Sequence, residues 1–142
     1  LQLAEMVGRR ARRHRVSGRV VALTLRYADF TGVSRQQVQP DYLDSSEAIY
    51  RAGVKILDSM LLDQPVRLLG IRLSGLRFRT GQLPLFAEER RRFLLTEARD
   101  SANDRYGEFT VMFGSLLEQQ GKGSHVISPA WRPQGVRNVA VR

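Results

Sequence analysis

The sequence predicts an α+β fold in which two helices pack on one face of a small mixed β-sheet, followed by a C-terminal helix and an irregular tail. Before residue 80, two segments repeat apolar residues at helical spacing, and two segments alternate apolar and polar residues as half-buried strands do. A polar segment between a turn and a proline predicts one more strand. These segments follow one another in the order helix, strand, strand, helix, strand. Such an order fits a sheet that has helices on one side and leaves its other side uncovered.

The N-terminal part of the chain predicts a basic helix and a first strand. Residues 1–14 have apolar side chains on one side of a helix and arginines around the rest. Residues 17–30 then alternate, so that valine, leucine and tyrosine side chains lie on one side of a strand and Thr24 and Arg26 on the other. We expect the apolar side of this strand to face the helices.

Two further strands are predicted. The chain is expected to turn at residues 31–32 into the polar segment 33–40, which pairs with the first strand as a hairpin. This second strand is expected to end at Pro40, because proline cannot donate a backbone hydrogen bond to a sheet. Residues 65–78 alternate again, with leucine and isoleucine on one side and arginine and serine on the other. They predict the third strand.

Two helices are predicted in the rest of the chain. Residues 45–62 have apolar side chains at helical spacing, and Asp44 with Glu47 three positions later resembles a capping box at the helix start. Residues 87–107 repeat leucine and alanine at helical spacing and end at Gly107, a residue suited to a helix C-cap.

The strongest functional signal is the charge. The formal net charge is +9, and the positive residues are arginines apart from Lys55 and Lys122. Guanidinium groups bind phosphate oxygens with two parallel hydrogen bonds, and the arginines are spread along the chain, which favours a nucleic-acid backbone as partner. A generally arginine-rich composition, with no functional meaning, would account for the same charge.

The uncovered side of the predicted sheet gathers side chains that can donate hydrogen bonds to phosphate. It lacks the exposed aromatic pairs with which an RNA recognition motif stacks bases, so contact with the backbone is favoured over base reading. A merely solvated polar surface is the alternative for any single residue of this set. The candidate DNA-binding residues are Thr24, Arg26, Arg35, Gln37, Arg72 and Ser74.

Several classes of function are excluded. The chain has no cysteine, which excludes a disulfide framework and a cysteine-based zinc site and favours a cytoplasmic location. No segment is long enough and apolar enough to cross a bilayer. His14 and His125 are far apart, and no paired carboxylate motif, P-loop or nucleophile elbow occurs. We therefore expect no catalytic residue, metal site, cofactor or small-molecule substrate in this chain.

The stretch "GQLPLF", residues 81–86, places a proline and large apolar side chains directly before the charged segment "AEERRR". It is too short for a membrane span, and Pro84 argues against a helix interior or a central strand. The stretch is therefore either a buried connection or a peptide that enters a pocket of another protein.

Together these segments resemble the C-terminal little-finger domain of Y-family translesion DNA polymerases, in the bacterial DNA polymerase IV branch. The resemblance runs over about residues 1–111, in the order of the family, and its most specific parts are "RYADF", "VRLLGIRLSGL" and "NDRYG". It implies a little-finger fold whose first strand precedes the present chain. The chain starts without methionine and without a signal-peptide core, so we expect it to be a fragment cut from a longer protein. The resemblance also implies that the parent polymerises DNA with magnesium in a separate palm domain, so that this fragment of a nucleotidyltransferase is not itself an enzyme.

The resemblance further implies two partners. One is primer-template DNA, bound through its phosphates in DNA repair and in translesion synthesis past damaged DNA during the SOS response, at the nucleoid. The other is the bacterial sliding clamp, because "QLPLF" resembles the pentapeptide with which such polymerases bind it. The clamp-binding residues would be Gln82, Leu83, Leu85 and Phe86. Packing of the following helix on the domain would sequester Phe86 and weaken clamp binding.

The expected organisation is a DNA-binding domain, a clamp-binding motif, a C-terminal helix, and a final region with a strand-like segment, a linker and a proline-containing tail. These correspond to residues 1–80, 81–86, 87–107 and 108–142. Two alternatives stay open. In the first, the parent is a catalytically inactive, clamp-bound polymerase-like adaptor in mutagenic repair. In the second, the chain is a basic RNA-binding module, and its likeness to the pentapeptide is a coincidence.

Overall fold

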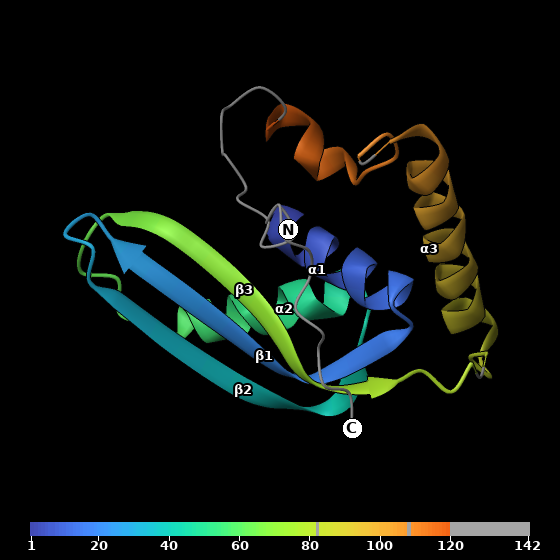
Figure 1. Cartoon of the computed structure of the whole chain (residues 1–142), viewed down its shortest axis with the longest axis horizontal. Coiled ribbons are helices and arrows are strands. Elements are labelled where there is room, and N and C mark those ends of the chain that lie inside the picture. Colours follow the sequence, from blue (N-terminus) through green and yellow to red (C-terminus); the bar gives the residue numbers. More distant parts are fainter. Residues whose placement is uncertain (82, 108, 120–142) are drawn as a thin grey trace, which may run out of the picture. The chain divides into compact units, whose positions relative to one another are not determined.

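The computed structural model describes residues 1–81, 83–107 and 109–119 (Figure 1). They form two compact units, one with Leu1–Arg79 and one that begins at Thr80. The first unit contains, in chain order, α1 (Gln2–Arg13), β1 (Val16–Tyr27), β2 (Gly32–Leu43), α2 (Ser46–Asp58) and β3 (Val66–Phe78). The predicted α+β class and the predicted order of these elements are confirmed.

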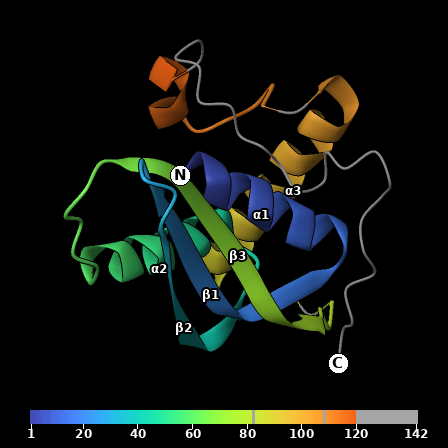
Figure 2. The ribbon, with the colours of Figure 1, turned by 60° about the vertical axis from the view of Figure 1, so that its left-hand side comes forward.

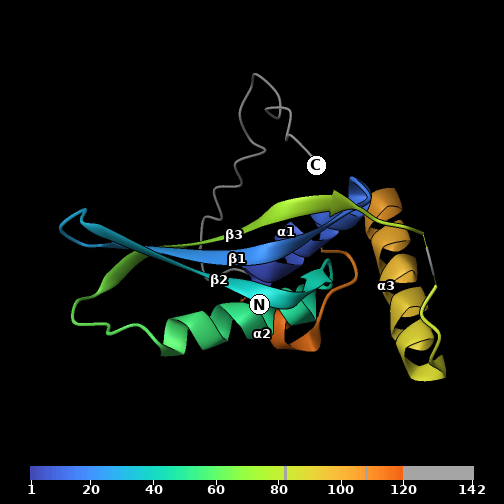
Figure 3. The same ribbon diagram turned by 90° about the horizontal axis from the view of Figure 1, so that it is seen from below.

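The sheet of the first unit has three strands in the order β2-β1-β3 (Figure 2). Both pairings are antiparallel, so the expected mixed sheet is wrong for the described strands. The reason is the chain path, because β1 and β2 form a hairpin and the connection through α2 then crosses β1 to reach its far edge. β2 and β3 consequently run in the same direction but are separated by β1. Both helices lie on one side of this sheet (Figure 3).

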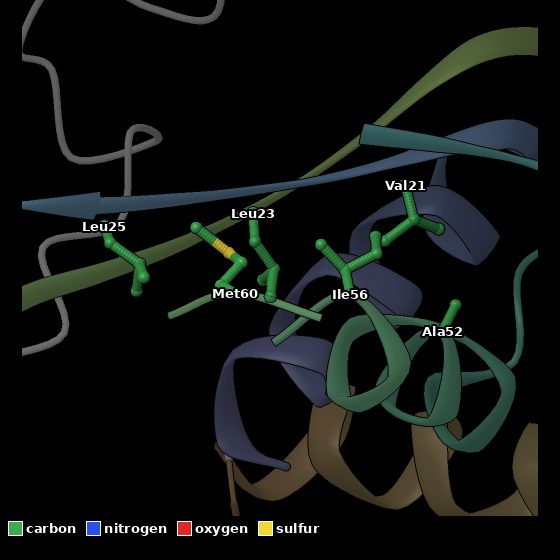
Figure 4. Close-up of a cluster of buried hydrophobic side chains, with 6 residues drawn as sticks. All are labelled: Val21, Leu23, Leu25, Ala52, Ile56 and Met60. Atoms are coloured by element: carbon green, nitrogen blue, oxygen red, sulfur yellow. The ribbon is translucent and has the colours of Figure 1, made fainter. Parts of the chain in front are cut away.

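The core lies between β1 and α2 and follows from the alternation of β1. Its alternate residues Val21, Leu23 and Leu25 are at most 3% exposed, while Thr24 and Arg26 between and after them are exposed. Figure 4 shows the apolar side chains directed toward α2 and the turn that follows it. The buried cluster consists of Val21, Leu23, Leu25, Ala52, Ile56 and Met60.

α1 and α2 approach closely at Gly8. A Cβ atom at this position would lie 2.7 Å from the Ser46 Oγ atom, so only glycine fits without a shift. Next to this crossing, Arg12 Nη1 donates hydrogen bonds to the Asp44 backbone oxygen at 2.8 Å and to Ser46 Oγ at 3.2 Å. The basic side of α1 therefore helps to hold the start of α2.

The start of α2 differs from the expected capping box. Ser45 is the N-cap, and its hydroxyl accepts a hydrogen bond from the Ala48 backbone N–H at 3.4 Å. The Asp44 carboxylate instead forms an ion pair with Arg79 Nε at 2.8 Å. Asp44 thus links the end of the first unit to the β2–α2 connection, a long-range contact that its spacing from Glu47 does not reveal.

The turn of the hairpin comes earlier than the expected Thr31-Gly32. The Tyr27 N–H donates to the Thr31 backbone oxygen at 2.9 Å, and Phe30 adopts a left-handed conformation with φ of 68°. Asp29 therefore lies in the turn, where its carboxylate accepts hydrogen bonds from the Thr31 hydroxyl at 2.7 Å and the Thr31 N–H at 2.9 Å. These hydrogen bonds lower the pKa of the Asp29 carboxyl below its ordinary value.

β2 continues past Pro40, so the expected end of this strand is wrong. The register between β1 and β2 shifts between the pairs Gly18–Leu43 and Val20–Val38, which marks a bulge. Pro40 lies within this irregular part of an edge strand, where a missing N–H does not interrupt the pairing.

The second unit contains α3 (Ala87–Tyr106) and the short 3₁₀ helix η1 (Gly114–Gln119). Gly107 is the C-cap of α3 with φ of 110°, which confirms the predicted helix end.

The strand expected after residue 108 is not formed by residues 109–119. The buried Asn103 side chain explains this, because it donates to the Val111 backbone oxygen at 2.9 Å and accepts from the Val111 N–H at 2.8 Å. Both backbone groups of Val111 are therefore occupied. The linker and tail, with Trp131, lie outside the described residues.

Replacement of Gly18 by alanine is expected to destabilise the domain. The new Cβ would overlap the Leu73 side chain, and overpacking of this kind costs about 1–3 kcal/mol. Gly70→Ala is the matched control, since its Cβ would meet only Thr24 atoms at 3.8 Å and beyond, which is ordinary contact. This control is expected to be neutral or to stabilise by roughly 0.4–1 kcal/mol through the unfolded state. Urea denaturation followed by circular dichroism measures both, and equal effects would contradict the packing at Gly18.

Candidate nucleic-acid interface

The side of the sheet opposite α1 and α2 is not covered by any helix of the first unit, and we call it the open face. Because directly paired residues of neighbouring strands point to the same side, the register defines its members from Thr24 and Arg26. Thr24 pairs with Ser34 on β2 and Gly70 on β3, and Ala22 pairs with Gln36 and Arg72. The open face contains Val20, Ala22, Thr24, Arg26, Ser34, Gln36, Val38, Leu68, Arg72 and Ser74.

Four of the candidate DNA-binding residues lie on the open face as expected. They are Thr24, Arg26, Arg72 and Ser74. Arg26 and Arg72 are exposed, and no ion pair within the described part of the chain involves either of them. The open face has no carboxylate among its members, so its charge is positive. The DNA-binding role of these four residues stays a prediction.

The expected place of Arg35 and Gln37 on the uncovered side is wrong. Arg35 pairs with Leu23 and Gln37 pairs with Val21, and both partners are buried against the helices. The second strand is polar on both sides, so its alternation does not indicate which side faces the core. The register instead depends on the turn, and a shift by one residue exchanges the two sides.

Ser34 occupies the position on the open face that the sequence reading gave to its neighbour Arg35. Its hydroxyl donates to the Leu23 backbone oxygen at 3.0 Å and lies 3.2 Å from the Thr24 hydroxyl. Since the Ser34 proton is used in this way, the Thr24 hydroxyl is the donor between the two. A phosphate oxygen that accepts from Thr24 would replace only that exposed hydrogen bond.

Arginines stacked on aromatic rings lie at the two ends of the sheet, and no periodic pattern in the sequence indicates them. At the hairpin end, the Arg67 guanidinium carbon lies 4.5 Å from the centre of the Phe30 ring. At the bulged end, the Arg77 guanidinium carbon lies 3.6 Å from the centre of the Tyr42 ring. Each pair joins segments that are far apart in sequence, which local spacing cannot show.

The candidate clamp-binding residues lie in the second unit, except that Gln82 is outside the described residues. Leu83, Leu85 and Phe86 are 54%, 83% and 68% exposed. Pro84 is partly buried, and Arg90 Nε donates to its backbone oxygen at 3.4 Å, so the first turn of α3 contacts the peptide that precedes it.

Among residues 1–81, 83–107 and 109–119, no group of three or more histidine, aspartate or glutamate side chains lies close enough to hold a metal ion. None of the helices in these ranges is long and apolar enough to cross a membrane. His125 is outside these ranges.

The fold and the open face define a class of protein, a small α+β domain with a basic sheet surface suited to a polyanion. Comparison with known proteins gives the family. Residues 1–85 match the family described as the impB/mucB/samB family C-terminal domain. The chain belongs to this family, which confirms the resemblance to the C-terminal domain of Y-family DNA polymerases.

Similar curated proteins are named DNA polymerase IV. That of Pelotomaculum thermopropionicum is 36% identical over 88% of this chain and 33% of its own length. That of Moorella thermoacetica is 37% identical over 78% of this chain and 28% of its own length. The DNA polymerase IV 2 of Bacillus subtilis is 31% identical over 86% of this chain and 31% of its own length. The chain thus spans about a third of the length of these relatives.

Proposed function

We propose that this domain binds primer-template DNA through its phosphates and thereby serves a Y-family polymerase in translesion synthesis and DNA repair. The observation that carries the proposal is the open face, on which Arg26 and Arg72 are exposed with no carboxylate beside them. Guanidinium and hydroxyl groups are the usual protein donors to phosphate oxygens. The family supports the choice of DNA over other polyanions, because the relatives carry the name DNA polymerase IV.

The open face favours contact with the backbone over contact with the bases. None of its members is aromatic, so it offers no platform on which a base would stack. Arginine and hydroxyl side chains on a shallow sheet bind phosphates, which fix the position of a duplex without reading its sequence. Phosphates are the same whether or not a base is damaged. Binding through phosphates therefore lets a translesion polymerase hold DNA equally well with and without a lesion.

The second part of the proposal is that "QLPLF" tethers the parent enzyme to the bacterial sliding clamp. The exposure of Leu85 and Phe86 supports it, because apolar anchors that enter a partner's pocket must be accessible before binding. Pro84 restricts the backbone of the peptide, and the hydrogen bond from Arg90 restricts it further. Both lower the conformational entropy that binding would cost.

The catalytic step belongs, in this proposal, to a palm domain of the parent outside the present chain. Two-metal phosphoryl transfer requires carboxylates gathered around magnesium ions. The described residues contain no such group, so no step of polymerisation is assigned to them. The domain acts at the nucleoid, in the cytoplasm, by holding the parent on DNA and on the clamp.

The affinity of the domain for a primer-template duplex is expected to fall steeply as salt is raised. Replacement of Arg26 or Arg72 by alanine should weaken binding and reduce the slope of log K against log salt by about 0.9 each, because each removes one phosphate contact. Fluorescence anisotropy titrations at several salt concentrations measure the slope.

Arg51→Ala is the matched control for this experiment. Arg51 is exposed on α2, away from the open face, and its i,i+4 ion pair with Glu47 is of the kind that contributes little to stability. This variant loses the same charge and should keep the slope of the unchanged protein. Affinity that does not depend on salt would remove the proposal, and equal affinity for a single-stranded RNA would favour an RNA-binding module instead.

Binding to a bacterial sliding clamp is expected to be lost in the double variant Leu85→Ala and Phe86→Ala. The two side chains supply most of the exposed apolar surface of the peptide, and such anchors dominate binding free energies. The control is Leu94→Ala with Leu95→Ala, two leucines of α3 that are 53% and 61% exposed. Surface plasmon resonance measures both, with circular dichroism to show that both are folded. If the control loses binding and the first variant keeps it, the assigned tether is wrong.

A further inference from the structure

Tyr42 points to the same side of the sheet as the open face, at the bulged end of β2. The next residue along the strand, Leu43, packs against the buried cluster on the helix side. Asp41 and Leu43 also line a shallow groove with Ala48 of α2. Because successive side chains of a strand point to opposite sides, Tyr42 faces away from the helices.

Arg77 reaches Tyr42 from the opposite edge of the sheet. It lies on β3, and the central strand β1 separates β3 from β2. At this point β1 contributes Gly18, which pairs with Leu43 on one side and with Leu76 on the other. Leu43 lies on the helix side, so the paired Leu76 lies there too, and the next residue, Arg77, points to the same side of the sheet as Tyr42. Its guanidinium carbon consequently lies 3.6 Å from the centre of the Tyr42 ring.

Arg19 brings a second guanidinium to the same ring. Its guanidinium carbon lies 6.0 Å from the ring centre, and its Nε donates to the Gln39 backbone oxygen at 2.9 Å. Both arginines are exposed, whereas Tyr42 is partly buried. No ion pair within the described part of the chain involves either arginine. Two positive groups are therefore held on one ring without an ion pair to a described carboxylate, an arrangement that an anion would stabilise.

We infer that Arg19 and Arg77 form an arginine clamp that binds one backbone phosphate of the DNA at the bulged end of the open face, with Tyr42 as its positioning residue. The inference rests on the proposed binding of DNA. It adds a defined phosphate site, outside the candidate residues, that fixes where along the sheet one strand lies. Tyr42 lies in the bulged part of β2, and bulges at sheet edges often change the direction of a side chain.

The role of Tyr42 follows from the Arg77 guanidinium that stacks on its ring. A ring with a guanidinium stacked on it at 3.6 Å has no free face there for a nucleotide base, so it does not serve as a stacking platform. It instead restricts the rotamers of Arg77, and a side chain that is held before binding loses less conformational entropy when it binds.

The test is a titration of a primer-template duplex against the whole chain at several salt concentrations. Arg77→Ala should weaken binding and reduce the salt slope by about 0.9, since one phosphate contact is lost. Tyr42→Leu should weaken binding about two- to fivefold with an unchanged slope, because it keeps every charge and removes only the ring that positions Arg77. Tyr42→Phe keeps the ring and should bind like the unchanged protein. Tyr50→Leu, a tyrosine of α2 that is 40% exposed, is the matched control and should have no effect.

Each outcome decides the inference. If the unchanged protein binds DNA while Arg77→Ala and Tyr42→Leu behave like Tyr50→Leu, the clamp is wrong and the proposed function stands. If Tyr42→Phe weakens binding as much as Tyr42→Leu, the ring does not position Arg77. If the unchanged protein does not bind DNA, the proposed function itself fails. Should thermal denaturation show Tyr42→Leu to be unfolded, Arg77→Lys replaces it. That variant keeps the charge but loses the planar fork, and it should weaken binding with an unchanged slope, whereas full affinity would overturn the clamp.

Discussion

The packing of one side of β1 against α2 is the constraint on which the rest of the structure depends. Val21, Leu23 and Leu25 must all be buried by the helices, and a strand that buries its odd positions exposes its even ones. Because β1 is the central strand, its pairing also decides which side chains of β2 and β3 share its outer side. The hydrophobic core thus defines the open face, and a slip of one residue would bury Arg26 and expose the core.

Strong alternation is what made the sequence informative. β1 and the two helices of the first unit were predicted because each has one clearly apolar side. The edge strand β2 lacks such a side, so its two candidate residues, Arg35 and Gln37, were assigned to the wrong side. The other errors come from contacts between distant positions. The side chain of Asn103 binds the backbone of Val111, and the Arg77 side chain of β3 stacks on the Tyr42 ring of β2. Neither contact leaves a periodic pattern in the sequence.

The two proposed binding elements belong to separate units and suit a polymerase that must pass damage. Phosphate contacts on an open sheet are individually weak and independent of sequence, so they allow a duplex to move. A short apolar peptide that binds a second protein adds attachment that does not depend on the DNA. When both are engaged, the second binding event becomes intramolecular and total affinity rises without any further contact. Neither element alone has to bind tightly.

The central claim is that DNA lies on the open face, and chemical-shift mapping by NMR with a primer-template duplex tests it most directly. The account predicts the largest amide shifts along β1 and β3, around Thr24, Arg26 and Arg72, and small shifts in α2. The main competing surface is α1, whose last turn carries Arg10, Arg12 and Arg13. Shifts concentrated on α1 or α2, with β1 and β3 unchanged, would contradict the account.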